Sequence, residues 1–281
     1  MASVNSPIRR FVKPILFKLF GKRLYKHFQY LAKLKDIKER LVEEPEIELL
    51  PHFIHAQDET LDIGANYAYY TERMANLCKQ GKVYAFEPIP FTASVAQKII
   101  KKLKLDNVVF FQKGVGNKTE TMQFTVPKLN FGAISAGQAH IATRNNEMIK
   151  NSTYHISDEY ETFNCQVVEI DTFLLPKLKN LTFVKIDIEG AEYFALQGMK
   201  QTLLTFKPVI LIEIVPLFLN SFNVNIQEFQ SFIEKDLNYL IFEYNKPVQK
   251  LEKVTGRALE KDKNYILIHP DKLSPLSHLI V

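Results

Sequence analysis

Thr60-Leu61-Asp62-Ile63-Gly64-Ala65-Asn66-Tyr67-Ala68-Tyr69-Tyr70 is the stretch that decides the fold of this chain. Its first four residues predict the end of a buried strand, the next three a tight turn, and 67–79 the helix that follows. A carboxylate at the strand tip (Asp62), a glycine that allows close backbone approach (Gly64) and a helix N-terminus together indicate a small-molecule site. Such sites lie at the carboxyl edge of a parallel sheet.

The ligand is indicated by what this turn lacks. A dinucleotide fingerprint needs a second and a third glycine so that the backbone contacts a pyrophosphate, and here the later positions are Asn66 and Tyr69. An acidic residue ahead of the glycine would also repel a phosphate. The turn therefore suits a ligand with a positive amino group and no phosphate, such as S-adenosylmethionine, and an ordinary strand-turn-helix connection is the alternative.

A second strand supports this interpretation. Residues 82–86 form a short apolar run that ends in Glu87, 25 residues after Asp62, and Pro88 and Pro90 then force a loop. This spacing is close to that at which an acidic side chain accepts hydrogen bonds from a ribose diol. On its own Glu87 would be interpreted as a solvated loop residue; together with Asp62 and Gly64 it predicts a cofactor contact.

Composition places the chain among ordinary globular proteins. It has 281 residues, of which 46% are hydrophobic and 24% charged, so it can bury one good-sized core. The two cysteines, Cys78 and Cys165, show no motif spacing, which argues against a disulfide framework and a structural zinc site. No run approaches the ~20 apolar residues of a membrane span, and lysines interrupt any signal-peptide core. We expect a cytoplasmic protein.

Positive charge is concentrated at the beginning of the chain. Residues 1–40 hold eleven Lys and Arg against two acidic residues, a net charge of +9, so the rest carries −4 within the overall +5. A slightly acidic body argues against a nucleic-acid partner. Helical spacing over 7–50 predicts an N-terminal helical extension, residues 1–50, ahead of a catalytic domain, residues 51–281. One predicted apolar face comprises Leu24, Phe28, Leu31 and Leu34.

This basic extension has two interpretations. It folds back over the core with its lysines in water, or residues 1–40 contact an anionic membrane surface, which would place the protein peripherally at the inner face of a membrane. For 24–50 the sequence favours the first interpretation, and for 1–20 both stay open.

Strands alternate with helices from residue 52 onward. Strands are expected at 61–63, 83–86, 108–112, 181–186, 208–214, 239–244 and 265–269, and helices at 67–79, 91–103, 172–178, after 190 and at 226–237. This alternation predicts a doubly wound, mostly parallel sheet. An insertion follows the third strand: 120–126 and 163–170 alternate as strands, whereas 127–162 has no periodicity and is expected to cover the acceptor site as a lid.

Four positions should converge at the carboxyl ends of the strands: Asp62, Glu87, Gly114 and Asp187, with Glu189 beside the last. Carboxylates around one crevice raise one another's pKa unless a cation offsets them. The cationic cofactor would do so, and a divalent metal is a second candidate whose ligands the sequence does not identify. The structural alternative for Asp187 is the N-cap of the following helix.

Three motifs carry a family resemblance. Leu61-Asp62-Ile63-Gly64-Ala65-Asn66, Tyr84-Ala85-Phe86-Glu87-Pro88 and Val184-Lys185-Ile186-Asp187-Ile188-Glu189-Gly190-Ala191-Glu192 resemble the FkbM family of S-adenosylmethionine-dependent methyltransferases, as does the shorter Val168-Glu169-Ile170-Asp171-Thr172-Phe173. The likeness covers about residues 58–215. It implies a class I methyltransferase (Rossmann-like) fold with an antiparallel C-terminal strand, the N-terminal helical extension and a β-hairpin or loop insertion after strand three.

The resemblance also implies an O-methyltransferase that acts on a hydroxyl of a sugar, glycan or related metabolite. Carried onto this chain, Asp62, Gly64 and Asn66 would surround the methionine portion of the cofactor and Glu87 its ribose. The residues bordering the adenine would be Lys113, Gly114 and Val115.

Removing a proton from an alcohol requires a base or a metal, and Asp187 and Glu189 are the candidates, with Glu213 in reserve. His140 and His155 of the insertion are more typical of solvated loop residues. Where the family commonly has glycine this chain has Ala68, which makes the helix opening bulkier.

Two other functions stay open at this point. A Rossmann-like sheet also suits an NAD-dependent oxidoreductase, against which the missing glycines count. The basic extension suits a non-catalytic module of a membrane surface or an assembly. The acceptor, the oligomeric state and the use of a metal are not specified by any motif.

Overall fold

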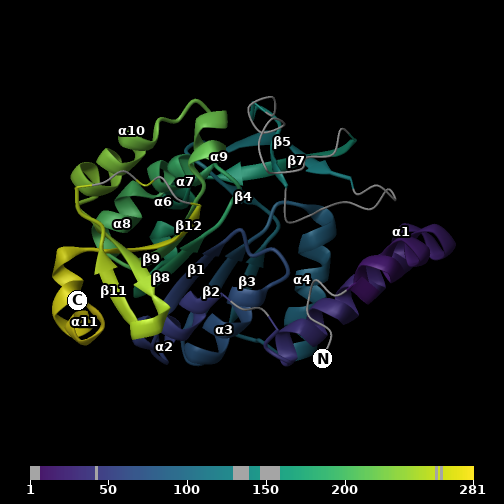
Figure 1. Ribbon diagram of the computed structural model, residues 1–281, viewed down its shortest axis with the longest axis horizontal. Coiled ribbons are helices and arrows are strands. Elements are labelled where there is room, and N and C mark those ends of the chain that lie inside the picture. Colours follow the sequence, from purple (N-terminus) through teal and green to yellow (C-terminus); the bar gives the residue numbers. More distant parts are fainter. Residues whose placement is uncertain (1–6, 42–43, 129–138, 146–158, 257–258, 260–261) are drawn as a thin grey trace.

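The computed structural model describes residues 7–41, 44–128, 139–145, 159–256, 259 and 262–281. In this described part, an eight-stranded sheet forms the centre of the molecule, in the order β11-β10-β12-β9-β8-β1-β2-β3 (Figure 1). β3, β2, β1, β8 and β9 run parallel, whereas β12 is antiparallel to β9, and β10 and β11 continue the antiparallel edge. The predicted doubly wound, mostly parallel sheet with an antiparallel C-terminal strand is confirmed.

The strands of this sheet follow the predicted runs closely. They are β1 (Glu59–Ile63), β2 (Lys82–Phe86), β3 (Val108–Phe111), β8 (Leu181–Ile186), β9 (Val209–Ile214), β10 (Leu240–Asn245), β11 (Lys250–Lys253) and β12 (Lys263–Ile268). β11 was not expected, because its Lys-Leu-Glu-Lys sequence is an exposed edge with one buried residue, Leu251.

Helices cover both faces of the sheet. One apolar core lies against the following helices: α6 (Ile170–Phe173), η3 (Leu175–Lys177), α7 (Glu192–Gly198), α8 (Lys200–Phe206), α10 (Ile226–Ser231) and η4 (Phe232–Asp236, a π-helical turn). The second core gathers residues from α2 (Leu50–Phe53), α3 (Tyr69–Leu77), α4 (Pro90–Leu103), η1 (Pro45–Leu49), α11 (Leu273–Leu276) and η7 (Ser277–Leu279). The remaining short helices are α9 (Pro216–Ser221), η5 (Lys246–Val248) and η6 (Pro270–Lys272).

The insertion after the third strand builds a second sheet. Its order is β4-β7-β5-β6, with β4 (Gly114–Val115), β5 (Glu120–Pro127), β6 (His140–Ile141) and β7 (Tyr160–Val168). β5 and β7 pair antiparallel over their whole lengths, so the predicted hairpin strands are confirmed as partners. Gly114 lies in the short strand β4. The expected lid, 127–162, falls largely outside the described residues.

The helix expected at 91–103 is confirmed as α4, whereas several other predicted helices were right in place but too long. The helix expected at 67–79 begins at Tyr69, because Ala68 adopts a left-handed conformation with φ 67°. The helix after 190 is two helices, α7 and α8, which meet at Met199. The helix expected at 172–178 is α6 followed by η3, and that at 226–237 divides into α10 and η4.

The N-terminal helix α1 (Pro7–Lys38) breaks at Gly21, where φ is 68° and ψ −179°. Beyond the break the helix packs on α4 through Tyr25, Leu34 and Ile37, which share a buried cluster with α4 side chains. The predicted face is only partly confirmed: Leu34 is buried as expected, but Leu24 and Leu31 are 37% and 45% exposed, while Gln29 and Asp36 are buried. Hydrogen bonding explains the inversion, since the Tyr69 hydroxyl donates to Asp36 and the Gln29 amide donates to the Tyr25 hydroxyl.

Candidate active site

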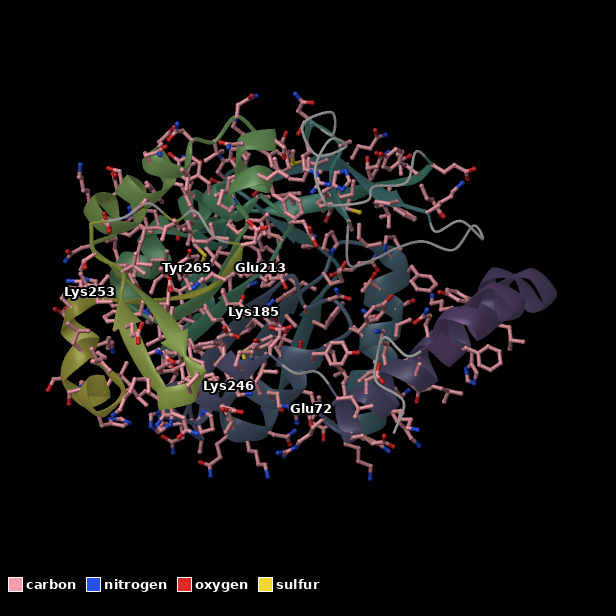
Figure 2. The ribbon with its side chains drawn as sticks, in the orientation of Figure 1. Glu72, Lys185, Glu213, Lys246, Lys253 and Tyr265 are labelled. Carbon is pink, nitrogen blue, oxygen red and sulfur yellow. The ribbon has the colours of Figure 1, made fainter. Side chains whose placement is uncertain are left out.

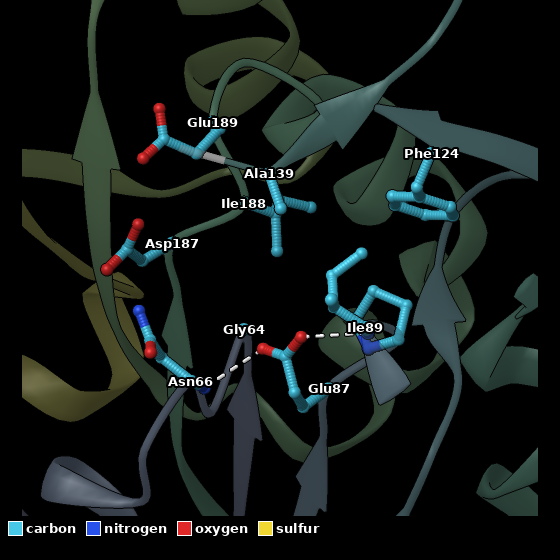
Figure 3. A pocket seen from close by; sticks show the side chains of 10 residues that line it. Gly64, Asn66, Glu87, Ile89, Phe124, Ala139, Asp187, Ile188 and Glu189 are labelled. Atoms are coloured by element: carbon cyan, nitrogen blue, oxygen red, sulfur yellow. Dashed lines mark hydrogen bonds between the residues drawn. The ribbon is translucent and has the colours of Figure 1, made fainter. Parts of the chain in front are cut away.

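A pocket lies at the carboxyl edge of the parallel strands, where it was predicted (Figure 3). Gly64 and Asn66 come from the turn after β1, Glu87 from the end of β2, and Asp187 and Glu189 from the loop after β8. The remaining described lining residues are Pro88, Ile89, Phe124, Ala139 and Ile188. The insertion therefore contributes to the same pocket as the three strand tips.

Gly64 holds the β1 turn against the β8 loop. Its φ is 85°, and a Cβ atom there would lie 1.9 Å from the carbonyl oxygen of Asp187. The Asp187 amide in turn donates to the Ile63 carbonyl oxygen at 3.0 Å. The close approach predicted for this glycine is thus an approach of two protein segments, which fixes the loop bearing Asp187 and Glu189 over the turn after β1.

Glu87 is fixed by two backbone amides. Its Oε2 accepts from the Asn66 amide at 3.1 Å and its Oε1 from the Ile89 amide at 2.9 Å (Figure 3). Burial raises the pKa of Glu87 to about 7, against the lowering effect of these two hydrogen bonds. Each oxygen keeps a further lone pair for a ligand, and Asn66 Oδ1 is buried without a partner among the described residues. Both groups suit ligand hydroxyl or ammonium donors.

Lys185 supplies a cation that the sequence reasoning missed. Lys185 is paired in register with Asp62 across β1 and β8, and its Nζ lies 2.6 Å from Asp187 Oδ2 and 4.9 Å from the centre of the Tyr70 ring. Burial alone would lower the pKa of Lys185, but the charges of Asp187 and Asp62 raise it above its usual value. A lone lysine in an otherwise apolar strand, two residues before Asp187, was the signal for this buried ion pair.

Glu213 completes this cluster from the neighbouring strand. Lys185 is buried and Glu213 is half-buried, and Figure 2 labels both near the middle of the view. A carboxyl hydrogen bond joins Glu213 to Asp187, which requires one proton between the two groups. Burial, together with the charge of Asp187, raises the pKa of Glu213 to about 9. Burial also pushes the pKa of Asp187 upward, but Lys185 and the hydrogen bond from Glu213 hold it below its usual range.

Asp187 does not cap the helix that follows it, so the structural alternative for this residue is wrong. Instead Glu192 Oε1 accepts from the amides of Ile188 and Gly190, both at 3.1 Å, and holds the loop after β8. Glu189 sits in that loop in a left-handed conformation with φ 58°. Burial raises the pKa of Glu189 to about 8, with Asp187 adding to the effect.

Arg144 enters the site from the insertion. Its guanidinium donates to the Glu189 carbonyl oxygen at 3.3 Å and lies 5.0 Å from the centre of the Phe218 ring. Burial lowers the pKa of Arg144 to about 10, against the nearby charge of Glu189. No motif identified this residue, because its part in the site depends on how the insertion folds back over the strand tips.

Other predicted site residues occupy neighbouring places. Asp62 is buried and does not line the pocket; Thr71 Oγ1 donates to its Oδ2 at 2.5 Å, and burial raises its pKa to about 6. Lys113 contacts Gln166 and lies 5.8 Å from the centre of the Phe173 ring. Val115 lines a separate cavity of about 230 Å³ beside Phe194 and Phe222, and Gly114 is buried in β4. His140 is buried in β6, and His155 lies outside the described residues.

The donor chemistry fits a cationic organic cofactor better than a metal ion. Asn66 Oδ1 and the Glu87 carboxylate can accept hydrogen bonds from the hydroxyl or ammonium groups of a ligand. Within the described residues, no three His, Cys, Asp or Glu side chains are grouped as a metal ion would require. Lys185 already balances the carboxylates that had suggested a divalent cation.

Residues 62–241, more than half of the chain, match the model of the methyltransferase FkbM domain. A curated relative, Methyltransferase 1 of Beauveria bassiana (strain ARSEF 2860), is 26% identical over 147 residues, which are 50% of this chain and 57% of that protein.

Among solved structures, methyltransferase FkbM from Methylobacillus flagellatus KT aligns with a TM-score of 0.46 and 13% identity, over 86% of this chain and 59% of that one. A SAM-dependent O-methyltransferase from Thermotoga maritima aligns with a TM-score of 0.44 and 11% identity, over 84% and 71%. The chain thus spans a little over half the length of the fungal relative and of the M. flagellatus protein. The match over 62–241 establishes that the chain belongs to the FkbM methyltransferase family.

Proposed function

We propose that this protein is an S-adenosylmethionine-dependent O-methyltransferase whose acceptor is a hydroxyl of a sugar, a glycan or a related metabolite. The observation that carries the proposal is the pocket in which Glu87 and Asn66 face Asp187 and Glu189 across the strand tips (Figure 3). Family membership supports methyl transfer, and the missing glycines together with the acidic strand tips disfavour a dinucleotide cofactor.

Two sets of residues would hold the two substrates. Glu87 and Asn66 offer acceptors for the ribose hydroxyls and the amino group of the cofactor, next to the turn at Gly64. When bound, S-adenosylmethionine would supply an electrophilic methyl group. The acceptor would lie toward the loop after β8 and the insertion, where Glu189, Arg144 and Phe218 meet.

Glu189 is the better candidate for the proton acceptor. The Asp187 carboxylate is held by the Lys185 ammonium and by the Glu213 carboxyl, which leaves it a weak base with a fixed position. Burial gives Glu189 a pKa of about 8, near the operating pH, so its deprotonated fraction is a stronger base than an ordinary carboxylate and suits general-base catalysis during methyl transfer. Asp187 then contributes a fixed negative charge at the pocket wall.

Calorimetry with the full chain tests the cofactor. S-adenosylmethionine should bind with a Kd in the micromolar range, and Glu87→Ala should weaken binding by about tenfold to a hundredfold, the range for a lost charged hydrogen bond. Glu120→Gln, at the exposed start of β5, is the matched control and should bind like the wild type. Folded protein that gives no heat of binding, or that binds NADH instead, would overturn the assignment.

Methyl transfer to a panel of hydroxyl, amine and carboxylate acceptors tests the substrate class. Glu189→Gln should keep the cofactor Kd and lower turnover by about 10²- to 10⁴-fold, the usual contribution of a general base. Transfer to amines alone would contradict O-methylation while leaving the cofactor assignment intact.

A further inference from the structure

The solvent-facing side of α1 carries apolar and basic residues, whereas the solvent-facing side of a surface helix is ordinarily polar. Beyond Gly21, the helix turns Gln29 and Asp36 inward onto the body of the protein and leaves Leu24 and Leu31 exposed. At 100° per residue, Leu24, Phe28 and Leu31 share one stripe, which continues into Lys35 and Lys38. We call Leu24, Phe28, Leu31, Lys35 and Lys38 the outer stripe; its leucines and lysines are exposed and Phe28 is half-buried.

Charge and shape add to this observation. The described helix, from Pro7 to Lys38, and the turn after it carry all eleven cations of the N-terminal extension, against Asp36 and Glu39. The half of α1 before Gly21 extends away from the body of the molecule (Figure 1). Its sequence places four cations, Arg9, Arg10, Lys13 and Lys18, among eight bulky apolar residues.

We propose that α1 binds the surface of an anionic lipid bilayer, with the outer stripe facing the headgroups. A helix with apolar and basic residues on one side lies in the interface plane and buries its apolar groups at the acyl boundary. Lysines near an anionic leaflet each add about 1 kcal/mol, roughly fivefold in affinity. Among the described residues, no helix has the length and hydropathy to cross a membrane, so the contact is peripheral.

A second copy of the chain fits this face less well. Two copies would oppose segments of charge +9 across the contact, and like charges facing each other weaken association. The area that two exposed leucines could bury is also far smaller than the ~800 Å² that each partner of a stable dimer buries. A bilayer with negative headgroups meets neither objection.

Vesicle co-sedimentation of the full chain tests the proposal. The protein should sediment with vesicles that contain about 30% phosphatidylserine and much less with pure phosphatidylcholine, and about 0.5 M salt should release it, because exposed charges are then screened. Lys35→Glu/Lys38→Glu should lower affinity by more than tenfold. Lys235→Glu/Lys253→Glu, at exposed sites on other elements, should have little effect.

The leucines have a matched control as well. Leu24→Ala/Leu31→Ala should lower vesicle affinity by about tenfold without moving the thermal midpoint, because both side chains are exposed. Leu204, 36% exposed on α8, is as exposed as Leu24, and Leu204→Ala should change nothing.

Three outcomes would overturn the proposal. They are absence of binding to anionic vesicles, equal binding to neutral ones without salt dependence, and wild-type binding by the leucine pair variant. Sedimentation velocity tests whether a second copy of the chain binds instead. A concentration-dependent dimer that the leucine pair variant loses would assign the outer stripe to a second copy.

Discussion

The roles of several residues in this protein are set by residues that are near them in space but distant in sequence. Gly64 was singled out as a place where a ligand approaches the backbone, and the atom that approaches is the Asp187 carbonyl oxygen. Lys185 was passed over within its motif, and it is the buried cation between Asp62 and Asp187. In both cases the local sequence marked the position, and a second strand determined its role.

Gly64→Ala should be strongly destabilising. The new Cβ would meet backbone at 1.9 Å in addition to adopting φ 85°, so the loss in the free energy of unfolding should be about 4 kcal/mol or more. Gly256→Ala, at φ 65° with no atom within 4 Å, meets only the conformational cost of about 1–2 kcal/mol. Urea unfolding of the two variants measures the difference; equal losses would show that the contact with Asp187 is not tight.

Elements of the chain are held in place by side chains that lie far away in sequence. The sequence places Asp171 just ahead of the helix predicted at 172–178, which is the position of an N-cap residue. Its carboxylate instead accepts from the amides of Gln201 and Thr202, at 2.9 and 2.8 Å, and from the Thr202 hydroxyl. It therefore caps α8, whose own N-cap position, Met199, offers no side-chain acceptor. Helix propensity predicted the helix but not the origin of its cap.

Asp171→Ala should lower the free energy of unfolding by about 1–2 kcal/mol, the usual cost of losing an N-cap. Asp106→Ala, at an exposed position in the turn after α4, is the control and should stay within about 0.5 kcal/mol of the wild type. Chemical denaturation of the two variants separates these outcomes. A loss no larger than that of the control would mean that water replaces the Asp171 carboxylate at α8.

At the scale of the whole molecule, the sheet collects buried carboxyl groups from separate strands. Glu87, Glu189 and Glu213 have pKa values of about 7, 8 and 9 because each is buried. A carboxyl group whose pKa is raised by folding stabilises the native state fully below its unfolded pKa, about 4.5. That stability is lost as the pH rises through the folded value. The loss should extend from about pH 5 to pH 9.

The melting temperature of the ligand-free protein should therefore decrease as the pH rises from 5 to 9. Glu213→Gln keeps the shape of the side chain and removes its titration, so the fall should become shallower in that variant, most clearly above pH 7. Glu234→Gln, at an exposed position on η4, should reproduce the wild-type slope. Parallel slopes for wild type and Glu213→Gln would contradict the shared proton between Glu213 and Asp187.

The sequence alone determined the alternation of strands and helices, the position of the pocket at the carboxyl edge, and the family. Each of these follows from short-range signals: hydrophobic periodicity, turn residues and motifs that lie within one strand and its turn. That is why the sequence predicted a common site for Gly64, Asn66, Glu87, Asp187 and Glu189, which line one pocket, whereas Asp62 and Gly114, predicted with them, do not line it.

Only the tertiary structure decided which charges neutralise one another and which face of α1 is buried. Lys185 meets Asp62 through the register of β8 on β1, Arg144 reaches Glu189 by way of the folded insertion, and Asp36 turns inward because Tyr69 donates to it. These contacts join residues 33 to 123 positions apart, and no local pattern encodes such pairs. A buried polar group takes whichever partner the fold brings near, since leaving it unpaired is more costly than breaking a helical pattern.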